Sequence, residues 1–294
     1  MRVFVTGASG FIGSIVTEDL IRAGHQVLGL ARSDEGAKIV AAAGAEVHRG
    51  DIYDLESLRS GVTKADGVIH CAFNHDDMAN FVANCETDRK VIEALGAELA
   101  GSDRHLVITS GVGRNASGKL RTEEDPLIPA SVFPRGASEE AAESILAKGV
   151  SVSVIRLPQV HDPFKQGLVT RMIGVARQKG VSAYVGDGTN RWAAAHRLDA
   201  ALLYRLALEK AVAGARYNAI GEEGVPLREI AESIGRGLKI PVVSVSPEKM
   251  GEHFGWLSMV AGVDMPGSSV LTQQWLGWRP SHVGLIADLD EAKF

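Results

Sequence analysis

The chain has 294 residues, of which 45% are hydrophobic and 23% charged, the balance of an ordinary folded protein rather than of a disordered or fibrous one. Lysine and arginine number 31 against 36 acidic residues, so the net charge of −5 provides no overall positive field for nucleic acid or an anionic membrane. Cys71 and Cys85 are too few for a disulfide framework, and no residues have the spacing of metal ligands. Because the N-terminus lacks a leader pattern and no apolar run is long enough to span a membrane, we expect a cytoplasmic protein.

In the first half of the chain, short runs rich in β-branched residues alternate with helical patterns. The expected strands are, in chain order, residues 2–5, 27–30, 45–48, 67–71, 106–109 and 152–157. The longest expected helices between them are 76–100 and 134–148. This alternation is typical of βαβ units and predicts an α/β fold, a doubly wound parallel sheet of the Rossmann type.

After Pro158 the pattern changes, because prolines and Gly-Asp-Gly turns divide the chain into short pieces. We expect a smaller C-terminal substrate-binding lobe to begin here. The expected division is a dinucleotide-binding domain at 1–158, segments returning to its sheet near 193–221, and the smaller lobe at 159–192 and 222–294. The returning segments are expected to be a helix at 199–210, capped by Asp199, and a strand at 216–220.

The strongest motif is the turn Thr6-Gly7-Ala8-Ser9-Gly10-Phe11-Ile12-Gly13, which follows the first strand and opens the first helix. A dinucleotide diphosphate binds the free N–H groups of a helix N-terminus, and glycines let it approach the main chain. We expect Gly7 and Gly10 to serve the turn and this approach, and Gly13 to allow close packing of the helix. Glycines in such a turn can also be purely structural, but the position within a βαβ unit favours nucleotide binding.

The pattern T-G-x-x-G-x-x-G resembles that of the extended short-chain dehydrogenase/reductase family, which includes sugar-nucleotide epimerases and dehydratases and hydroxysteroid dehydrogenases. Further resemblances lie at Gly50-Asp51-Ile52, at Val68-Ile69-His70-Cys71-Ala72, at Gly186-Asp187-Gly188 with His196-Arg197-Leu198-Asp199, and at Leu276-Gly277-Trp278-Arg279-Pro280. Such relatives commonly form dimers through the two long helices, which here correspond to 76–100 and 134–148. The resemblance and the turn together predict cofactor contacts at Gly7, Ser9, Gly10, Phe11, Ile12, Gly13, Arg32, Asp51, Ile52, Cys71, Ala72 and Phe73.

The end of the second strand predicts which dinucleotide is used. Proteins that prefer NAD place an acid there to bind the ribose hydroxyls, whereas here Arg32 offers a guanidinium that suits a 2′-phosphate. Asp34 and Glu35 follow, where we expect them to start the next helix. We therefore expect NADP rather than NAD; the alternative is that Arg32 is a solvated loop residue.

At the catalytic position the resemblance breaks down. Redox members of the family carry a Tyr-x-x-x-Lys pair on one helix face, in which the lysine lowers the pKa of the tyrosine, together with a serine or threonine beyond the fifth strand. Here Arg135 and Glu139 stand at the tyrosine and lysine positions, and the serine position falls on Gly111 or Ser110. Arg135 is a poor proton donor but could stabilise an oxyanion or hold a carboxylate or phosphate. The alternative is an Arg135–Glu139 ion pair on a solvated helix face.

Other candidate groups follow the strand ends, where ligands of such sheets bind. They are Asn74, His75, Asp76, Gln159, His161 and, with lower standing, Tyr184. His161 and His75 could titrate near neutrality and are the best substitutes for the tyrosine, although a lone loop histidine is more often structural. Arg191 and His196 lie where sugar-nucleotide enzymes contact substrate phosphate, but surface or packing roles are slightly favoured.

Three functions remain open. The first is an NADP(H)-dependent oxidoreductase acting on a small carbonyl or hydroxyl compound with Arg135, Ser110 and His161 in its active site. The second is a non-catalytic NADP(H)-binding redox sensor or regulator. The third is a nucleotide-sugar epimerase or dehydratase, which needs the same tyrosine and lysine.

Overall fold

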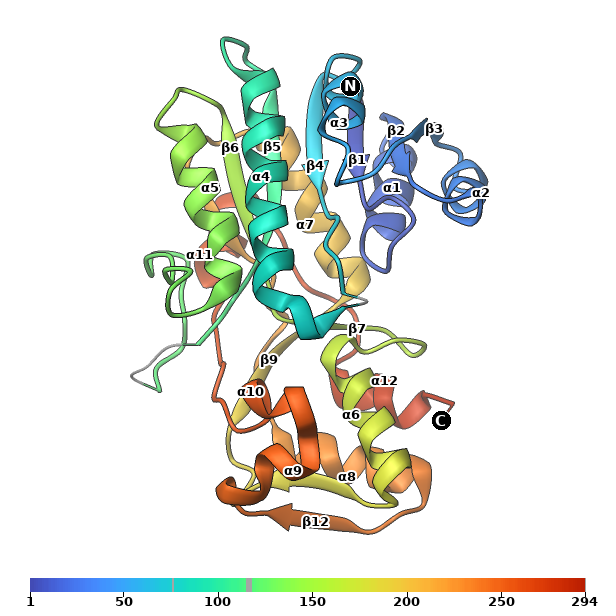
Figure 1. The fold of residues 1–294 in the computed structure, drawn as a ribbon, viewed down its shortest axis with the longest axis vertical. Coiled ribbons are helices and arrows are strands. Elements are labelled where there is room, and N and C mark those ends of the chain that lie inside the picture. Colours follow the sequence, from blue (N-terminus) through green and yellow to red (C-terminus); the bar gives the residue numbers. More distant parts are fainter. Residues whose placement is uncertain (76, 115–117, 294) are drawn as a thin grey trace.

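The computed structural model describes residues 1–75, 77–114 and 118–293. Its main sheet is formed by β1 (Arg2–Thr6), β2 (Gln26–Ala31), β3 (Glu46–Arg49), β4 (Gly67–His70), β5 (His105–Gly111), β6 (Val152–Leu157) and β10 (Arg216–Asn218). These strands lie in the order β10-β6-β5-β4-β1-β2-β3, and every neighbouring pair is parallel (Figure 1). The predicted Rossmann-type sheet is confirmed.

Helices cover both faces of this sheet (Figure 1). One face packs against α1 (Gly13–Arg22), α2 (Asp34–Ala42) and α7 (Arg197–Lys210). The other face packs against α3 (Leu55–Val62), α4 (Phe81–Leu99) and α5 (Ala137–Leu146), and α4 and α5 lie side by side. Because the sheet is covered on both sides, the inner strands β1, β2 and β4 are largely apolar, whereas the edge strands β3 and β10 carry charged residues.

The strand β1 shows how sequence produces this double burial. Val3 and Val5 enter the core beneath α1 and α7, whereas Phe4 between them enters the opposite core, and all three are fully buried. Successive side chains of a strand point to opposite faces, so three consecutive apolar residues supply both cores. Gly61 of α3 lies against the Phe4 ring, where an added Cβ would come within 2.4 Å of it.

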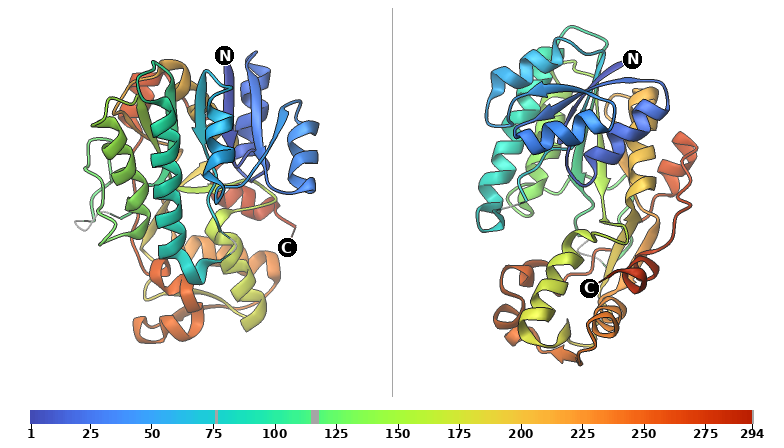
Figure 2. Two further views of the ribbon diagram at one scale, coloured as in Figure 1. Left: turned by 45° about the horizontal axis from the view of Figure 1, so that its top comes forward. Right: turned by 90° about the vertical axis from the view of Figure 1, so that its right-hand side faces the viewer.

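The C-terminal part forms a smaller lobe with its own apolar core (Figure 2). It contains a three-stranded sheet, in the order β11-β9-β7, and a two-stranded sheet of β12 and β8. The strands are β7 (Gln159–His161), β8 (Ser182–Val185), β9 (Arg191–His196), β11 (Glu222–Pro226) and β12 (Val242–Val245). The helices are α6 (Gly167–Lys179), α8 (Leu227–Leu238), α9 (Met250–Phe254), α10 (Ser258–Ala261) and α12 (Leu285–Glu291). The exact bounds of the two predicted domains stay a prediction.

The remaining elements are short. They are α11 (Val270–Leu276) and the 3-10 turns η1 (Met78–Asn80), η2 (Pro134–Gly136), η3 (Pro247–Lys249) and η4 (Gly255–Leu257). The helix expected at 134–148 begins as the 3-10 turn η2. The helix expected at 76–100 is seen as η1 followed by α4, and Asp76 lies outside the described residues. None of the described helices is long and apolar enough to cross a membrane.

The predicted cap of the returning helix is wrong. The helix α7 begins at Arg197, and the His196 ring accepts the hydrogen bond from the Leu198 N–H. Asp199 lies within the first turn, where its carboxylate accepts hydrogen bonds from the backbone N–H groups of Ser281 and His282. The acid therefore holds the C-terminal segment to the helix, a long-range contact that local capping patterns do not reveal.

Candidate functional site

The glycine-rich turn between β1 and α1 is too tight for side chains at two of its glycines. Gly7 adopts the left-handed conformation with φ +69°, and a Cβ there would lie 2.8 Å from the Ala72 nitrogen. A Cβ on Gly13 would lie 2.1 Å from the Gly7 carbonyl oxygen. Ile12, at the N-cap of α1, offers no side-chain hydrogen bond to the first turn of the helix. The closely packed backbone of this turn and the N-terminus of α1 therefore fit the diphosphate of a dinucleotide.

This turn lies where the order of the strands reverses, because the first strand has β2 on one side and β4 on the other. Cys71, Ala72 and Phe73 follow β4 directly, and the Ala72 N–H donates to Thr6 Oγ1 at 3.3 Å. Ligands of open α/β sheets bind outside the strand ends at such a switch point. Burial raises the pKa of Cys71 to about 12, which keeps its thiol protonated. The predicted contacts at the ends of these two strands are thus brought together.

The ends of β2 and β3 lie side by side, since Ala31 pairs with Arg49 in the sheet. Arg32 follows directly, and Ser33 caps α2 by accepting the Gly36 N–H. Asp34 is the first residue of that helix, as predicted, and its carboxylate is paired with Arg49. The nearest acid after the second strand is therefore already engaged with a cation.

The remaining predicted cofactor residues lie around this edge. Ser9 faces the start of α2, because a Cβ on Gly36 would lie 3.1 Å from Ser9 Oγ. Asp51 follows β3, and its Oδ1 accepts the Tyr53 N–H at 2.9 Å. Ile52 packs against the core on the α3 side of the sheet. Their contacts with a cofactor stay predictions.

Arg135 is buried in the 3-10 turn η2, directly before α5, and its side chain contacts α4, α5 and β5. Its Nη1 lies 2.5 Å from Asp88 Oδ2 on α4 and also contacts Ser138 Oγ. Its Nη2 donates to the Thr109 carbonyl at the end of β5, at 2.9 Å. The guanidinium lies over the Phe73 ring, with Cζ 4.2 Å from the centroid. Arg135 therefore connects the ends of the fourth and fifth strands.

Asp88 is the centre of this buried polar network. Besides Arg135, it accepts a hydrogen bond from Ser138 Oγ at 2.6 Å and contacts His70 Nε2 at 2.9 Å. The other ring nitrogen of His70 lies 2.7 Å from Thr6 Oγ1, at the glycine-rich turn. Burial opposes ionisation of Asp88, but the Arg135 guanidinium and the His70 contact outweigh it and hold the pKa of Asp88 well below its usual range.

Glu139, at the position that the resemblance assigns to lysine, has a different partner from the one expected. Its two carboxylate oxygens accept from Nε and Nη2 of Arg156, at 3.0 and 2.8 Å, and Arg216 Nε lies 3.5 Å away. Glu139 and Arg156 are both buried. The expected Arg135–Glu139 pair on a solvated face is therefore wrong: the two side chains point into separate buried clusters.

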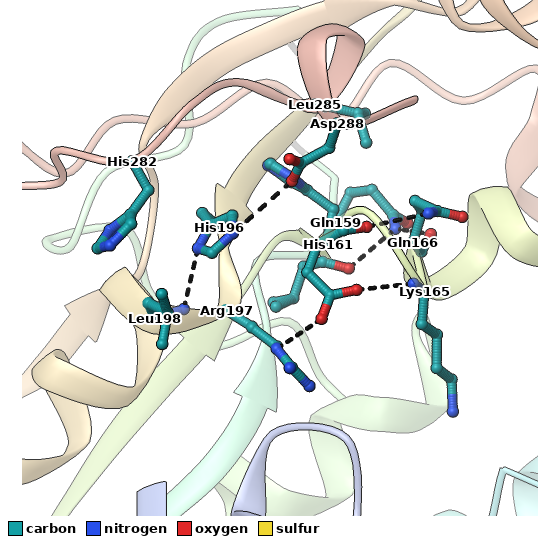
Figure 3. Close-up of polar contacts among 12 residues, drawn as sticks. Gln159, His161, Lys165, Gln166, His196, Arg197, Leu198, His282, Leu285 and Asp288 are labelled. Atoms are coloured by element: carbon teal, nitrogen blue, oxygen red, sulfur yellow. Dashed lines mark hydrogen bonds and ion pairs between the residues drawn. The ribbon is translucent and has the colours of Figure 1, made fainter. Parts of the chain in front are cut away.

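Ser110 and His161 are placed in different surroundings. Ser110 is buried near the end of β5, next in sequence to the carbonyl that Arg135 contacts. His161 is fully buried, with Nδ1 2.6 Å from Asp288 Oδ2 and its ring against His196 (Figure 3). Burial lowers the pKa of His161 to about 4 and raises that of Asp288. These surroundings do not favour His161 as a proton donor to substrate, and its catalytic role stays a prediction.

The other candidates have structural partners. Gln159 Oε1 accepts the Leu168 N–H at 3.1 Å, and the Tyr184 hydroxyl accepts from Arg228 at 2.9 Å. Asn74 Nδ2 donates to the Tyr53 hydroxyl at 3.0 Å. His75 lies beside the Phe73 ring, and Asp76 lies outside the described residues.

Arg191 is held by an acid rather than left for a substrate phosphate. Its Nε and Nη2 lie 3.1 and 2.8 Å from the two carboxylate oxygens of Asp264, and its backbone N–H donates to the same group. Burial opposes the ionisation of Asp264, but these hydrogen bonds lower its pKa. The slightly favoured packing role of Arg191 agrees with this geometry.

Sequence reasoning missed Asp88, the residue that orients Arg135. A signal was present, because Cys85, Asp88, Val91 and Ile92 share the buried face of α4. A charge on an apolar helix face indicates a buried partner. Among the described residues, no group of three or more acidic, histidine or cysteine side chains could hold a metal ion.

Comparison with known proteins agrees with this fold. Residues 3–220 match the sequence profile described as the NAD dependent epimerase/dehydratase family. The chain is 48% identical to the uncharacterized protein C2A9.02 of Schizosaccharomyces pombe over 98% of both chains. It is 30% identical to 2-alkyl-3-oxoalkanoate reductase of Stenotrophomonas maltophilia, over 83% of this chain and 77% of that one.

A solved structure shares the fold at lower sequence identity. It is DesIV, a dTDP-glucose 4,6-dehydratase from Streptomyces venezuelae with NAD and TYD bound, which aligns with a TM-score of 0.79. The alignment covers 100% of this chain and 96% of that one at 21% identity. With the profile match across most of the chain, the protein belongs to the NAD dependent epimerase/dehydratase family, whose members are NAD(P)-dependent.

Proposed function

We propose that the protein is an NADP(H)-dependent oxidoreductase that interconverts a small carbonyl compound and its alcohol, with Arg135 in place of a proton-donating tyrosine. The observation that supports this most is the position of Arg135, at the strand ends beside the glycine-rich turn and oriented by Asp88. When bound, the coenzyme supplies or accepts the hydride. The 30% identity with a 2-alkyl-3-oxoalkanoate reductase supports a carbonyl as the reacting group.

In this proposal Arg135 acts by electrostatics. A guanidinium does not give up its proton near neutrality, but it stabilises the negative charge that develops on the oxygen of a reduced carbonyl. Ser110, near the end of the same strand that Arg135 contacts, supplies a second hydrogen bond to that oxygen. The proton that completes the alcohol comes from solvent water, and in the reverse direction it returns to water. Because Asp88 balances the charge of Arg135, we infer that the substrate is uncharged at the reacting end.

The preference for NADP is part of the proposal. Arg32 follows β2, and the carboxylate nearest to it in sequence, Asp34, is paired with Arg49. This pairing reduces the repulsion that an acid at this position would exert on a 2′-phosphate. We therefore infer that a 2′-phosphate is accepted here more readily than beside an unpaired acid.

The test is oxidation of NADPH with a panel of aldehydes, ketones and quinones. We expect turnover above background, and a decrease of more than tenfold in kcat/KM for Arg135→Lys, which keeps the charge but loses the planar fork. The affinity for NADPH and the unfolding midpoint of the variant serve as controls. Equal turnover by a folded Arg135→Lys protein would contradict the role of Arg135.

A non-catalytic sensor is the second candidate. The observation in its favour is that Glu139, at the lysine position, is committed to Arg156 and leaves no cation to activate a proton donor there. Tight NADPH binding without turnover across the panel would support it. The nucleotide-sugar alternative is less favoured, because Asp264 occupies the guanidinium of Arg191.

A further inference from the structure

Two cations outside the glycine-rich turn lie over the ring of Phe11, which belongs to that turn. Lys165 Nζ lies 5.4 Å from the centroid of the ring, and Arg197 Cζ lies 5.2 Å from it. Lys165 comes from the segment between β7 and α6, and Arg197 is the first residue of α7. We refer to these two residues as the cation pair. Figure 3 shows their side chains extending in the same direction, toward the pale blue ribbon of the N-terminal segment.

A buried carboxylate orients both members of the cation pair. Asp162 Oδ1 accepts the backbone N–H groups of Phe164 and Lys165, at 2.8 and 2.7 Å. Asp162 Oδ2 lies 2.6 Å from Arg197 Nε. This ion pair uses the inner nitrogen of the guanidinium, and Figure 3 shows the terminal nitrogens beyond it. Asp162 is therefore the fixed point from which the two cations project.

The backbone around Lys165 is held by further hydrogen bonds. The Asp162 N–H donates to the Lys165 carbonyl at 2.9 Å, and Gln166 Nε2 donates to the Asp162 carbonyl at the same distance. Gln159 Nε2 contacts the Gln166 carbonyl. The loop is thus fixed, while the Lys165 side chain is exposed. A long flexible ammonium on a fixed loop can reach a ligand without a loop rearrangement.

The charges near Phe11 favour an anion. Two cations and the carboxylate of Asp162 leave one net positive charge, and the N-termini of α1 and α7 both lie at this place. Helix N-termini carry partial positive charge from their free N–H groups. A cation over a partly exposed aromatic ring is held more weakly than one in a charge-assisted hydrogen bond to phosphate. The contact with Phe11 is therefore one that a phosphate can replace.

We propose that the cation pair forms the second half of the diphosphate site. The turn supplies backbone N–H groups from one side, and Lys165 and Arg197 bind the diphosphate oxygens from the other. This inference rests on the proposed function in taking a dinucleotide as the ligand. It adds that the loop from the smaller lobe contributes to cofactor affinity, so that bound cofactor links the two parts of the chain.

The test compares the binding of three ligands to the full chain and to Lys165→Met. NADPH carries both the diphosphate and the 2′-phosphate, ADP-ribose only the diphosphate, and adenosine 2′-monophosphate only the 2′-phosphate. Titration calorimetry should show a loss of about tenfold in affinity for NADPH and ADP-ribose, and no loss for adenosine 2′-monophosphate. Lys249→Met removes the same charge from an exposed site in the smaller lobe and should bind as the wild type does.

The outcomes separate this inference from the proposed function. Unchanged affinity for ADP-ribose in Lys165→Met would overturn the inference, as would a loss confined to the two ligands that carry a 2′-phosphate. Because Lys165 is exposed, this variant keeps the fold, which an unchanged unfolding midpoint would verify. If the expected losses of affinity occur but no carbonyl is reduced, the result supports the diphosphate role of the cation pair and contradicts the oxidoreductase proposal. If the wild type binds none of the three ligands, both fall.

Discussion

Replacement of Asp88 by asparagine tests whether the buried network positions Arg135. Asp88 is 3% exposed, and its carboxylate contacts Arg135 Nη1 at 2.5 Å, Ser138 Oγ at 2.6 Å and His70 Nε2 at 2.9 Å. Removing one partner of a buried pair leaves the other charge uncompensated, at a cost of about 3–5 kcal/mol. Since asparagine can keep one of these contacts, we expect Asp88→Asn to lose about 3 kcal/mol of unfolding free energy.

The assay is urea unfolding followed by tryptophan fluorescence, with Asp290→Asn as the matched control. Asp290 pairs with Arg236 at the surface, where an ion pair contributes below about 1 kcal/mol. A loss in Asp88→Asn no larger than in the control would refute the reasoning. The pH dependence provides a second check, because the pKa of Asp88 is held well below its usual range. Its stabilisation is present above the unfolded-state pKa of about 3.9 and is lost as the pH falls below it, so the two proteins should converge in acid.

Three further predictions concern separate parts of the chain. Arg32→Ala should weaken the binding of NADPH more than that of NADH in calorimetry. An equal effect on both coenzymes would contradict the proposed preference for NADP. Glu139→Lys places a lysine where the resemblance assigns one, but it should not increase activity, because it sets a third cation against buried Arg156 and its neighbour Arg216. We expect this variant to lose about 3–5 kcal/mol of unfolding free energy in urea, and a variant as stable as the wild type would contradict this. Burial lowers the pKa of His105 to about 4. The contribution of neutral His105 to the free energy of unfolding is therefore complete above the unfolded-state pKa of about 6.5 and declines by about 3 kcal/mol toward pH 4. His105→Gln should flatten that decline, and an unchanged slope would exclude His105 as its source.

The main sheet could be predicted from the sequence because most of its strands are short, rich in apolar residues and followed by a helical pattern. Burial on both faces makes the strands of a parallel sheet largely apolar, and residues 152–157, four of which are apolar, were predicted with the bounds that the structure shows. The glycine-rich turn was equally readable, since Gly7 and Gly13 are required by local backbone geometry. Signals of this kind act over a few residues.

The site beyond the turn depends on partners that are distant in the sequence. Arg135 and Asp88 are 47 residues apart in the sequence. Glu139 is paired with Arg156 rather than with Arg135, four positions before it. A helix places residues four positions apart on one face, but it does not say whether that face is buried or which strand end it meets. For the same reason the carboxylate of Asp199 could be taken for a cap, although it binds backbone groups 82 and 83 residues away.

Calorimetric titration of the purified protein with NADPH tests the central claim most directly. A turn whose backbone packs closely at Gly7 and Gly13, at the N-terminus of α1, should bind one NADPH per chain, more tightly than NADH. If neither coenzyme binds at millimolar concentration, the turn is a structural feature only, and both the oxidoreductase and the sensor are excluded.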